Sequence, residues 1–167
     1  AVVNLSPDMH QQCVSILGEK RCVTIGNPVD TGKFLPVSLN KTKIKLRDKM
    51  RLPKDAFIIS SVGNIRSRKN QLLLLRVLKG VKQYNSKLHL VLIGRYDLDQ
   101  ESETYFHSLQ DYIKEFKLKK FVTFVGHTDQ VASYLQASDV FMFASEREGL
   151  PNAVLEAMAC GLPTIMK

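Results

Sequence analysis

The sequence predicts an α/β fold built on a doubly wound, Rossmann-like parallel sheet. From residue 56 onward, short apolar runs rich in β-branched residues alternate with longer stretches of helical periodicity. Several of these runs end at a glycine, and their near-continuous apolarity indicates strands buried on both faces. Repeated β-α-β units of this kind connect parallel strands, so the helices are expected on both sides of one sheet.

The first 36 residues are expected to form a smaller unit and a linker. A strand near 2–5, a helix near 8–17 and a strand at 22–25 are followed by the turn-rich segment 26–36. The basic run at 41–54 is interpreted as one solvated helix face, with membrane or nucleic-acid contact as the alternative.

The larger unit, residues 37–167, carries the main sheet. Its strands are expected at 56–63, 87–94, 120–126 and 139–144, with a fifth beginning at 163–166. Its helices are expected at 70–84, 101–117, 130–137 and 151–160. Leu72, Leu75 and Leu78 lie on one helical face and are predicted to be core.

Composition limits the partners and the compartment. The 167 residues carry 24 Lys and Arg against 16 acids, a net charge of +8, which suits a nucleotide, a phosphorylated lipid or an anionic membrane face. Cys13, Cys22 and Cys160 are too widely spaced for a Cys-x-x-Cys metal site and indicate a reducing cytoplasm. No apolar run reaches the roughly 18 residues of a membrane span, so any membrane contact is expected to be peripheral.

The segment 145–163, SEREGLPNAVLEAMACGLP, is the most informative for chemistry. Pro151 lies where a helix should begin and Gly161 where it should end. The free N–H groups of such a helix, at the carboxyl edge of a parallel sheet, suit a diphosphate. Glu148 and Glu156 lie about two turns apart, so one carboxylate could hold sugar hydroxyls and the other ribose hydroxyls. The alternative is a helix N-terminal acid and a solvated helix residue.

A cationic turn follows the first strand of the larger unit. Gly63 closes that strand, and Arg66, Arg68 and Lys69 precede the next helix. Cations at this edge could neutralise a departing diphosphate through charge-assisted hydrogen bonds, and a solvated basic loop is the alternative. A phosphate-binding loop is not predicted at Gly26, Gly32 and Lys33. The glycine spacing is one residue too long for that motif, and Phe34 stands where the motif has Ser or Thr.

These two segments resemble the GT-B glycosyltransferases of the group 1 family, in particular the C-terminal donor-binding domain. The string with Glu148 and Glu156 resembles the family's E-x7-E signature, and Lys69 matches the lysine that contacts the donor diphosphate. Asn64 occupies the place of the family's arginine, so Arg66 is expected to supply that charge. The resemblance extends through VLIG at 91–94, FVGH at 124–127 and the linker string GNPVDTGKF.

The resemblance also implies a role for each site residue. Glu148, Lys69 and Arg66 are the expected catalytic residues, with Glu148 on the donor sugar and Glu156 on the ribose. The expected donor-binding residues are Gly63, Asn64, Gly126, His127, Gly149, Leu150, Pro151, Asn152 and Glu156, with Gly126 and His127 near the nucleotide base. No metal site is expected.

The implied function is transfer of a sugar from a nucleoside-diphosphate sugar to a hydroxyl acceptor, sugar, lipid-linked or other, with retention of anomeric configuration. The implied pathway is cell-envelope, polysaccharide or glycolipid biosynthesis in the cytoplasm, with peripheral contact at the inner membrane face. The nucleotide sugar is a substrate, so no cofactor is expected. Residues 1–36 would be the end of an acceptor domain plus linker, and 37–167 a donor domain incomplete at its C-terminus and inactive alone.

Two alternatives stay open at the level of sequence. A nucleotide-sugar epimerase can share the same fold, because function depends on the site rather than on the fold. A non-catalytic basic module that binds nucleotide or nucleic acid would use the 41–54 segment instead. No aromatic-rich strand signature supports RNA binding, so no nucleic-acid partner is expected. The donor base and sugar, the acceptor and the oligomeric state are left undetermined.

Overall fold

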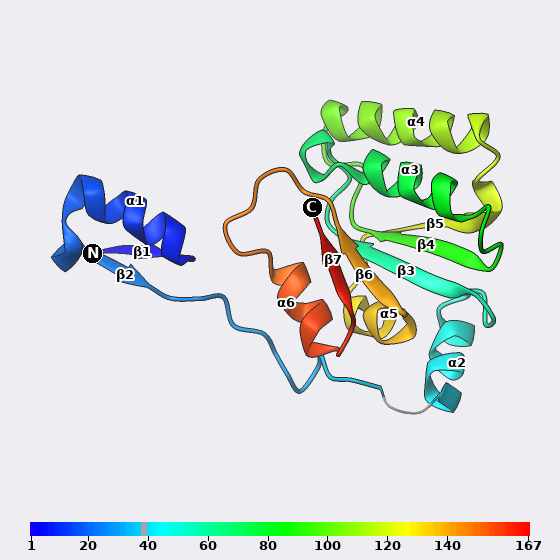
Figure 1. Ribbon diagram of the computed structural model, residues 1–167, viewed down its shortest axis with the longest axis horizontal. Coiled ribbons are helices and arrows are strands. Elements are labelled where there is room, and N and C mark those ends of the chain that lie inside the picture. The colour runs from blue at the N-terminus through cyan, green and yellow to red at the C-terminus, as the bar shows by residue number, and fades with distance from the viewer. Residues whose placement is uncertain (38–39) are drawn as a thin grey trace.

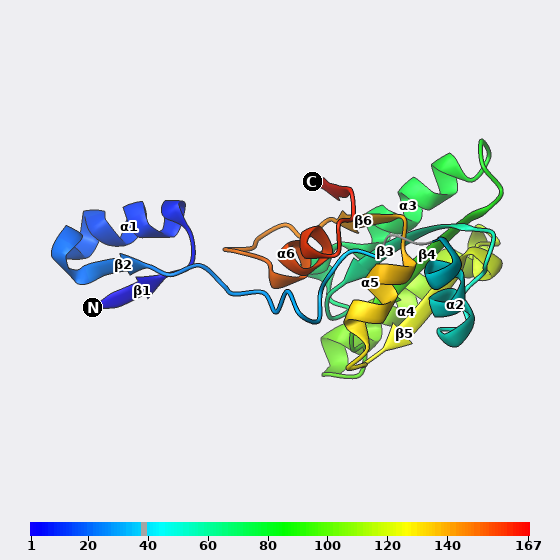
Figure 2. The same cartoon turned by 90° about the horizontal axis from the view of Figure 1, so that it is seen from below.

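The computed structural model describes residues 1–37 and 40–167, which form two separate parallel sheets (Figure 1). In the smaller unit, β1 (Val2–Asn4) pairs with β2 (Cys22–Thr24), and α1 (Pro7–Leu17) connects them. Ser6 caps α1 by accepting a hydrogen bond from the Met9 N–H at 3.4 Å. Figures 1 and 2 both show this unit set apart from the larger sheet and joined to it by an extended linker.

The larger sheet has five parallel strands in the order β5-β4-β3-β6-β7. Their bounds are β3 (Phe57–Val62), β4 (Leu88–Ile93), β5 (Val122–Gly126), β6 (Val140–Phe143) and β7 (Thr164–Met166). The chain first builds outward from β3 to β5 and then returns to add β6 on the other side of β3. This reversal defines a switch point between β3 and β6, where open α/β sheets bind their ligands.

Helices cover both faces of the sheet, which confirms the doubly wound α/β fold (Figures 1 and 2). The helices are α2 (Asn40–Lys49), α3 (Gln71–Val81), α4 (Gln100–Glu115), α5 (Val131–Ala137) and α6 (Asn152–Ala159). Helices α3 and α4 pack on one face, and α2, α5 and α6 pack on the other. The expected stripe on α3 is core at Leu75 and Leu78, whereas Leu72 is only partly buried and Leu74 is buried instead.

The strands differ in burial according to their position in the sheet. All six residues of the central strand β4 are buried, as the apolar pattern predicts. Every residue of β5 is only half-buried, because β5 is an edge strand of the sheet. The prediction of burial on both faces is therefore right for the centre of the sheet and wrong for this edge.

The basic run at 41–54 is shorter as a helix and less solvated than the sequence indicates. Helix α2 ends at Lys49, Arg51 adopts a left-handed conformation with φ 55°, and Pro53 follows. Arg47 is buried with only 7% of its surface exposed, which corrects the interpretation of this run as one solvated helix face.

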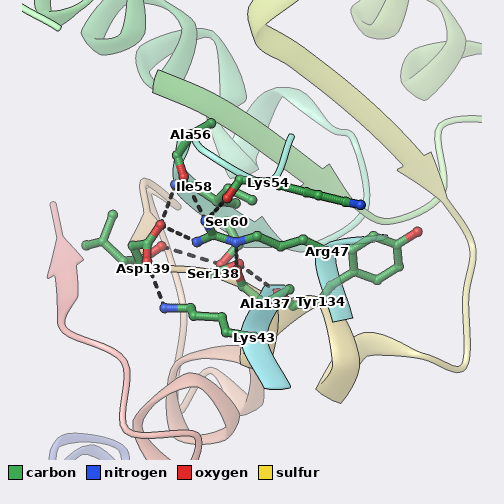
Figure 3. Close-up of polar contacts among 11 residues, drawn as sticks. Lys43, Arg47, Lys54, Ala56, Ile58, Ser60, Tyr134, Ala137, Ser138 and Asp139 are labelled. Atoms are coloured by element: carbon green, nitrogen blue, oxygen red, sulfur yellow. Dashed lines mark hydrogen bonds and ion pairs between the residues drawn. The ribbon is translucent and has the colours of Figure 1, made fainter. Parts of the chain in front are cut away.

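Arg47 is the centre of a polar cluster between α2, the start of β3 and the start of β6 (Figure 3). Its guanidinium donates to the carbonyl oxygens of Ala137, Lys54 and Ala56, each at 2.9 Å, and to the Asp139 carboxylate at 2.6 Å. Asp139 also accepts from Lys43 and from the Ile58 N–H, each at 2.7 Å. Burial acts to raise the pKa of Asp139, but these donors outweigh it and lower that pKa below its usual value.

Replacing Arg47 should destabilise the fold strongly. Arg47→Met leaves three backbone carbonyls without their donor and removes the buried partner of Asp139, so the free energy of unfolding should fall by about 3 kcal/mol. Urea unfolding followed by circular dichroism measures the change. The matched control is Lys45→Met in the same helix at an exposed position, which should change stability by less than about 0.5 kcal/mol. Equal effects of the two substitutions would show that the cluster is unimportant for stability.

Candidate functional site

The candidate site lies at the carboxyl edge of the sheet, where β3 and β6 end side by side. These strands pair in parallel through Ile59 with Val140 and Ser60 with Phe141, so the loops that follow them emerge together. A backbone hydrogen bond connects the two loops, in which the Glu146 N–H donates to the Arg68 carbonyl at 3.0 Å. A cavity of about 390 Å³ opens beside them. Its lining residues are Asn27, Val62, Gly63, Lys69, Phe143, Glu148, Leu150, Pro151, Asn152, Ala153 and Glu156.

Lys69 and Glu148, predicted from two distant parts of the sequence, form an ion pair in this cavity. The Lys69 side chain is only 16% exposed and its ammonium lies 5.4 Å from the centre of the Phe143 ring. Ser145 donates from its hydroxyl to the Glu148 carboxylate at 2.7 Å. Partial burial acts to raise the pKa of Glu148, but the hydrogen bonds from Lys69 and Ser145 outweigh it, so the pKa is lowered and the carboxylate stays ionised near neutral pH.

The N-terminus of α6 opens onto the same cavity. Its N-cap is Pro151, which has no side-chain acceptor to cap the first N–H groups. Within residues 1–37 and 40–167, neither the Asn152 N–H nor the Ala153 N–H donates a hydrogen bond, and both residues line the cavity. These free donors and the positive end of the helix dipole make the position suitable for an anion.

Glu156 lines the cavity one turn further along α6. Burial raises the pKa of its carboxyl, and the positive charge of Lys33 opposes that effect only in part. In the described part of the chain, no hydrogen bond is made by the Glu156 carboxylate. A half-buried acceptor without a partner is suited to hydroxyl donors of a ligand.

Two other residues predicted from the loop after β3, Arg66 and Asn64, do not line the cavity. Arg66 pairs with Asp99 and with Glu101, the latter at 3.2 Å, and is not among the residues that line the cavity. Its charge is therefore already balanced by two carboxylates at the start of α4. Asn64 also lies outside the cavity lining, where its side chain accepts from the Arg95 N–H at 3.2 Å.

Gly126 and His127 lie at the end of β5, two strands away from β3, and do not line this cavity. The ends of the intervening strands approach closely: a Cβ at Gly94 would lie 2.1 Å from the Gly63 carbonyl oxygen. Gly94 in turn donates its N–H to the Gly126 carbonyl at 3.1 Å. Glycine at 94 therefore lets the ends of β3 and β4 approach closely along this edge.

Sequence reasoning missed Asn27, which enters the cavity from the linker. Its side-chain amide donates to the Leu150 carbonyl at 3.0 Å and to the Asn152 side-chain oxygen at 2.5 Å. It therefore fixes the turn that begins α6. The only local signal is an Asn-Pro pair in a turn-rich segment, which does not indicate a contact more than 120 residues away.

The described residues offer no cluster of three or more His, Cys, Asp or Glu side chains that could hold a metal ion. All three cysteines are free. Within the same residues, none of the helices combines the length and the apolarity needed to cross a bilayer.

This arrangement matches the donor domain of GT-B glycosyltransferases. It combines a parallel five-stranded sheet with a cation, two carboxylates and a free helix N-terminus at the switch point. The sequence matches the family described as glycosyl transferases group 1 over residues 42–167. The chain belongs to this family.

Similar proteins of known sequence come from several bacteria. An Escherichia coli UDP-Gal:alpha-D-GlcNAc-diphosphoundecaprenol alpha-1,3-galactosyltransferase is 31% identical over 144 residues, covering 85% of this chain and 35% of that protein. A Campylobacter jejuni N-acetylgalactosaminyltransferase is 28% identical over 89% of this chain and 35% of its own length. The name of that enzyme specifies a diphospho-undecaprenol-linked acceptor. The chain thus spans about a third of the length of these relatives.

Solved structures show the same fold at lower sequence identity. Anabaena HepE in complex with UDP superposes with a TM-score of 0.84 at 21% identity, over 99% of this chain and 44% of that one. The C-terminal domain of a Francisella tularensis group 1 glycosyl transferase gives a TM-score of 0.73 at 23% identity, over 83% of this chain and 70% of that domain. The expected GT-B C-terminal domain fold is confirmed.

The raised pKa of Glu156 predicts that this carboxylate lowers stability at neutral pH. A carboxyl whose pKa is higher in the folded than in the unfolded chain favours folding only while protonated, and this contribution is lost as pH rises through the folded-state pKa. Glu156→Gln should therefore raise the melting temperature at pH 7 to 8 and have little effect below about pH 4. Thermal unfolding across pH measures this difference. A stabilisation that does not depend on pH would contradict the assignment.

Proposed function

We propose that this chain is the donor-binding part of a retaining glycosyltransferase that transfers a sugar from a nucleoside diphosphate to a hydroxyl acceptor. The observation that carries the proposal is the meeting of Lys69, Glu148 and the free N-terminus of α6 around one cavity. Lys69 comes from the loop after β3, whereas Glu148 and the helix N-terminus come from the loop after β6. Together they offer positive charge, an acceptor for hydroxyl groups and N–H donors.

In this proposal Lys69 and the N–H groups of Asn152 and Ala153 bind the diphosphate and stabilise the charge that develops on it as the sugar leaves. Such groups act on the transition state because the leaving oxygen gains charge as the glycosidic bond breaks. Glu148 accepts hydrogen bonds from the donor sugar hydroxyls, and Glu156 accepts from the ribose. The acceptor hydroxyl attacks from the face that the diphosphate leaves, which retains the anomeric configuration. No metal ion takes part.

The ion pair between Lys69 and Glu148 organises the site before the donor arrives. The pair holds two charges at the places where the diphosphate and the sugar would bind, so little rearrangement is needed on binding. Arg66 is the secondary cation in this scheme. It does not line the cavity and is paired with Asp99 and Glu101, so its contribution is expected to be smaller than that of Lys69, which lines the cavity.

The relatives indicate the class of donor and acceptor. The name of the Escherichia coli enzyme specifies a UDP-sugar donor and a diphosphoundecaprenol-linked acceptor, and other relatives take their names from capsule and amylovoran biosynthesis. We propose a UDP-sugar as the donor, an acceptor hydroxyl on a glycan or a lipid-linked sugar, and a cytoplasmic site of action. Residues 1–36 would then be the end of the acceptor domain plus linker, and 37–167 the donor domain.

Removing the Lys69 ammonium should affect chemistry much more than folding. In the protein with both domains, Lys69→Ala should lower kcat by at least about a hundredfold, the size expected for loss of one group that stabilises developing charge. Arg66→Ala should lower it less, and Arg76→Ala at an exposed position of α3 serves as the matched control. The measurement is sugar transfer with product analysis. Unchanged turnover in Lys69→Ala would refute the mechanism, and release of an epimerised nucleotide sugar would favour the epimerase.

The nucleotide preference can be measured on this chain by calorimetric titration with UDP, GDP and ADP. We expect selective binding of UDP, weakened by Glu156→Ala because the ribose loses its acceptor. The Glu103→Ala variant, at an exposed position of α4, is the control for an acid outside the cavity. Nucleotide binding that is unaffected by Glu156→Ala would remove Glu156 from the site.

A further inference from the structure

A second charged feature lies at the opposite edge of the sheet from the candidate site. All neighbouring strands are parallel, so the segments that enter β3, β4 and β5 lie together at the amino edge. These segments and the last turns of α3 and α4 carry a group of lysines that we call the lysine surface. Its members are Lys54, Lys79, Lys82, Lys87, Lys114, Lys117, Lys119 and Lys120.

Contacts and shared hollows bring several of these lysines together, and Lys119 and Lys120, which are adjacent in the sequence, line two neighbouring hollows. Lys79 lies over the Phe116 ring at 3.4 Å and Lys82 over the Phe121 ring at 5.3 Å, which joins the end of α3 to the segment after α4. Phe121 also lines a hollow of about 340 Å³ together with Lys54, Lys87 and Lys120. A second hollow of about 580 Å³ next to edge strand β5 is lined by Lys114, Lys117 and Lys119.

The charge of this surface is largely unbalanced. Among the described residues, Lys54 is the one member that forms an ion pair, with Asp48 at 2.7 Å. Asp55 and Glu115 are the other acids carried by these segments. Much of the net charge of +8 is therefore concentrated here, whereas Lys69 and Arg66 at the carboxyl edge are each paired with carboxylates.

Two exposed side chains with apolar surface lie at the end of α3 and in the segment that joins α3 to β4, which carries part of the lysine surface. Tyr84 is 84% exposed and Val81 is 42% exposed, and both lie in the stretch between Lys79 and Lys87. An exposed tyrosine flanked in the sequence by Lys82 and Lys87 suits the interface of a bilayer, where the ring lies at headgroup level and the ammonium groups meet phosphates. Successive bases of a single-stranded nucleic acid stack on several free aromatic faces. Of the rings of Tyr84, Phe116 and Phe121, only that of Tyr84 is free, because the other two lie beneath lysine ammonium groups.

We propose that the lysine surface docks on the anionic lipid headgroups of a membrane, with Tyr84 entering the headgroup layer. Docking at the amino edge leaves the carboxyl edge and its cavity open, so lipid and nucleotide can bind together. The inference does not depend on the proposed function.

The test is co-sedimentation of the chain with vesicles of phosphatidylcholine alone or of phosphatidylcholine and phosphatidylglycerol in equal parts. We expect binding only to the anionic vesicles. This binding should be lost when salt is raised, because the Debye length falls from about 10 Å at 0.1 M to about 3 Å at 1 M. The variant Lys87→Glu/Lys119→Glu/Lys120→Glu should bind at least about a hundredfold more weakly. Tyr84→Ala should bind several-fold more weakly and keep the salt dependence, and Tyr84→Phe should bind nearly as well as the parent chain.

The matched control is Lys20→Glu/Arg21→Glu/Lys41→Glu, which changes the net charge by the same amount at exposed positions elsewhere. It should keep most of the vesicle binding, and circular dichroism establishes that each variant is folded. Equal loss in both triple variants would mean that overall charge, not this surface, drives binding and would overturn the proposal. Absence of vesicle binding together with salt-sensitive RNA binding would assign the surface to nucleic acid instead. Nucleotide titration of each variant reports separately on the donor cavity.

Discussion

The pairing of β3 with β6 is the constraint on which the rest of the structure depends. These strands are adjacent in the sheet although two complete strand-and-helix units separate them in the sequence. Asp139 fixes their start, because its N–H donates to the Ile58 carbonyl at 2.8 Å while its carboxylate accepts from the Ile58 N–H at 2.7 Å. Arg47 and Lys43 from α2 neutralise that carboxylate. The anchor at the amino end sets the register that brings Lys69 to Glu148 at the carboxyl end.

The cations of the candidate site are paired with carboxylates of the protein itself. Lys69 is paired with Glu148, and Arg66 with Asp99 and Glu101. Among the described residues that line the cavity, the N–H groups at the start of α6 and the Glu156 carboxylate make no hydrogen bond. A ligand with an anionic centre and hydroxyl groups would match both, which is the chemistry of a nucleotide sugar. Asn27 ties the linker to this position through its hydrogen bonds to the Leu150 carbonyl and the Asn152 side chain.

The parallel sheet separates two surfaces of different character. Its carboxyl edge carries the cavity in which Lys69 and Glu148 are paired, and its amino edge carries the lysine surface, in which Lys54 is the one member with an ion pair among the described residues. A six-residue strand is about 20 Å long, so the two edges lie well beyond one Debye length at physiological salt. The charge of one edge therefore has little effect on the pKa values and ligand affinity of the other. If the two proposals hold, membrane docking and donor binding can therefore be changed independently by mutation.

The sequence by itself determined the order and type of the elements and most of the residues around the cavity. Strand-length apolar runs predicted all five strands, because burial on a sheet leaves a local signature in the chain. Pro151 and Gly161 bounded α6 to within a few residues, because helix ends also have local chemical preferences. Lys69, Glu148 and Glu156 were named from their motifs and lie on one cavity.

Only the tertiary structure decided which of the candidate residues meet. The partners of Arg66 lie more than 30 residues away and those of Arg47 and Asn27 up to about 125 residues away, so no local pattern reports them. The half-burial of β5 likewise follows from its place at the edge of the sheet, which depends on strand order. Local propensity is a property of neighbouring residues, whereas charge pairing and burial depend on the packing of distant segments, and that packing exists only in the folded chain.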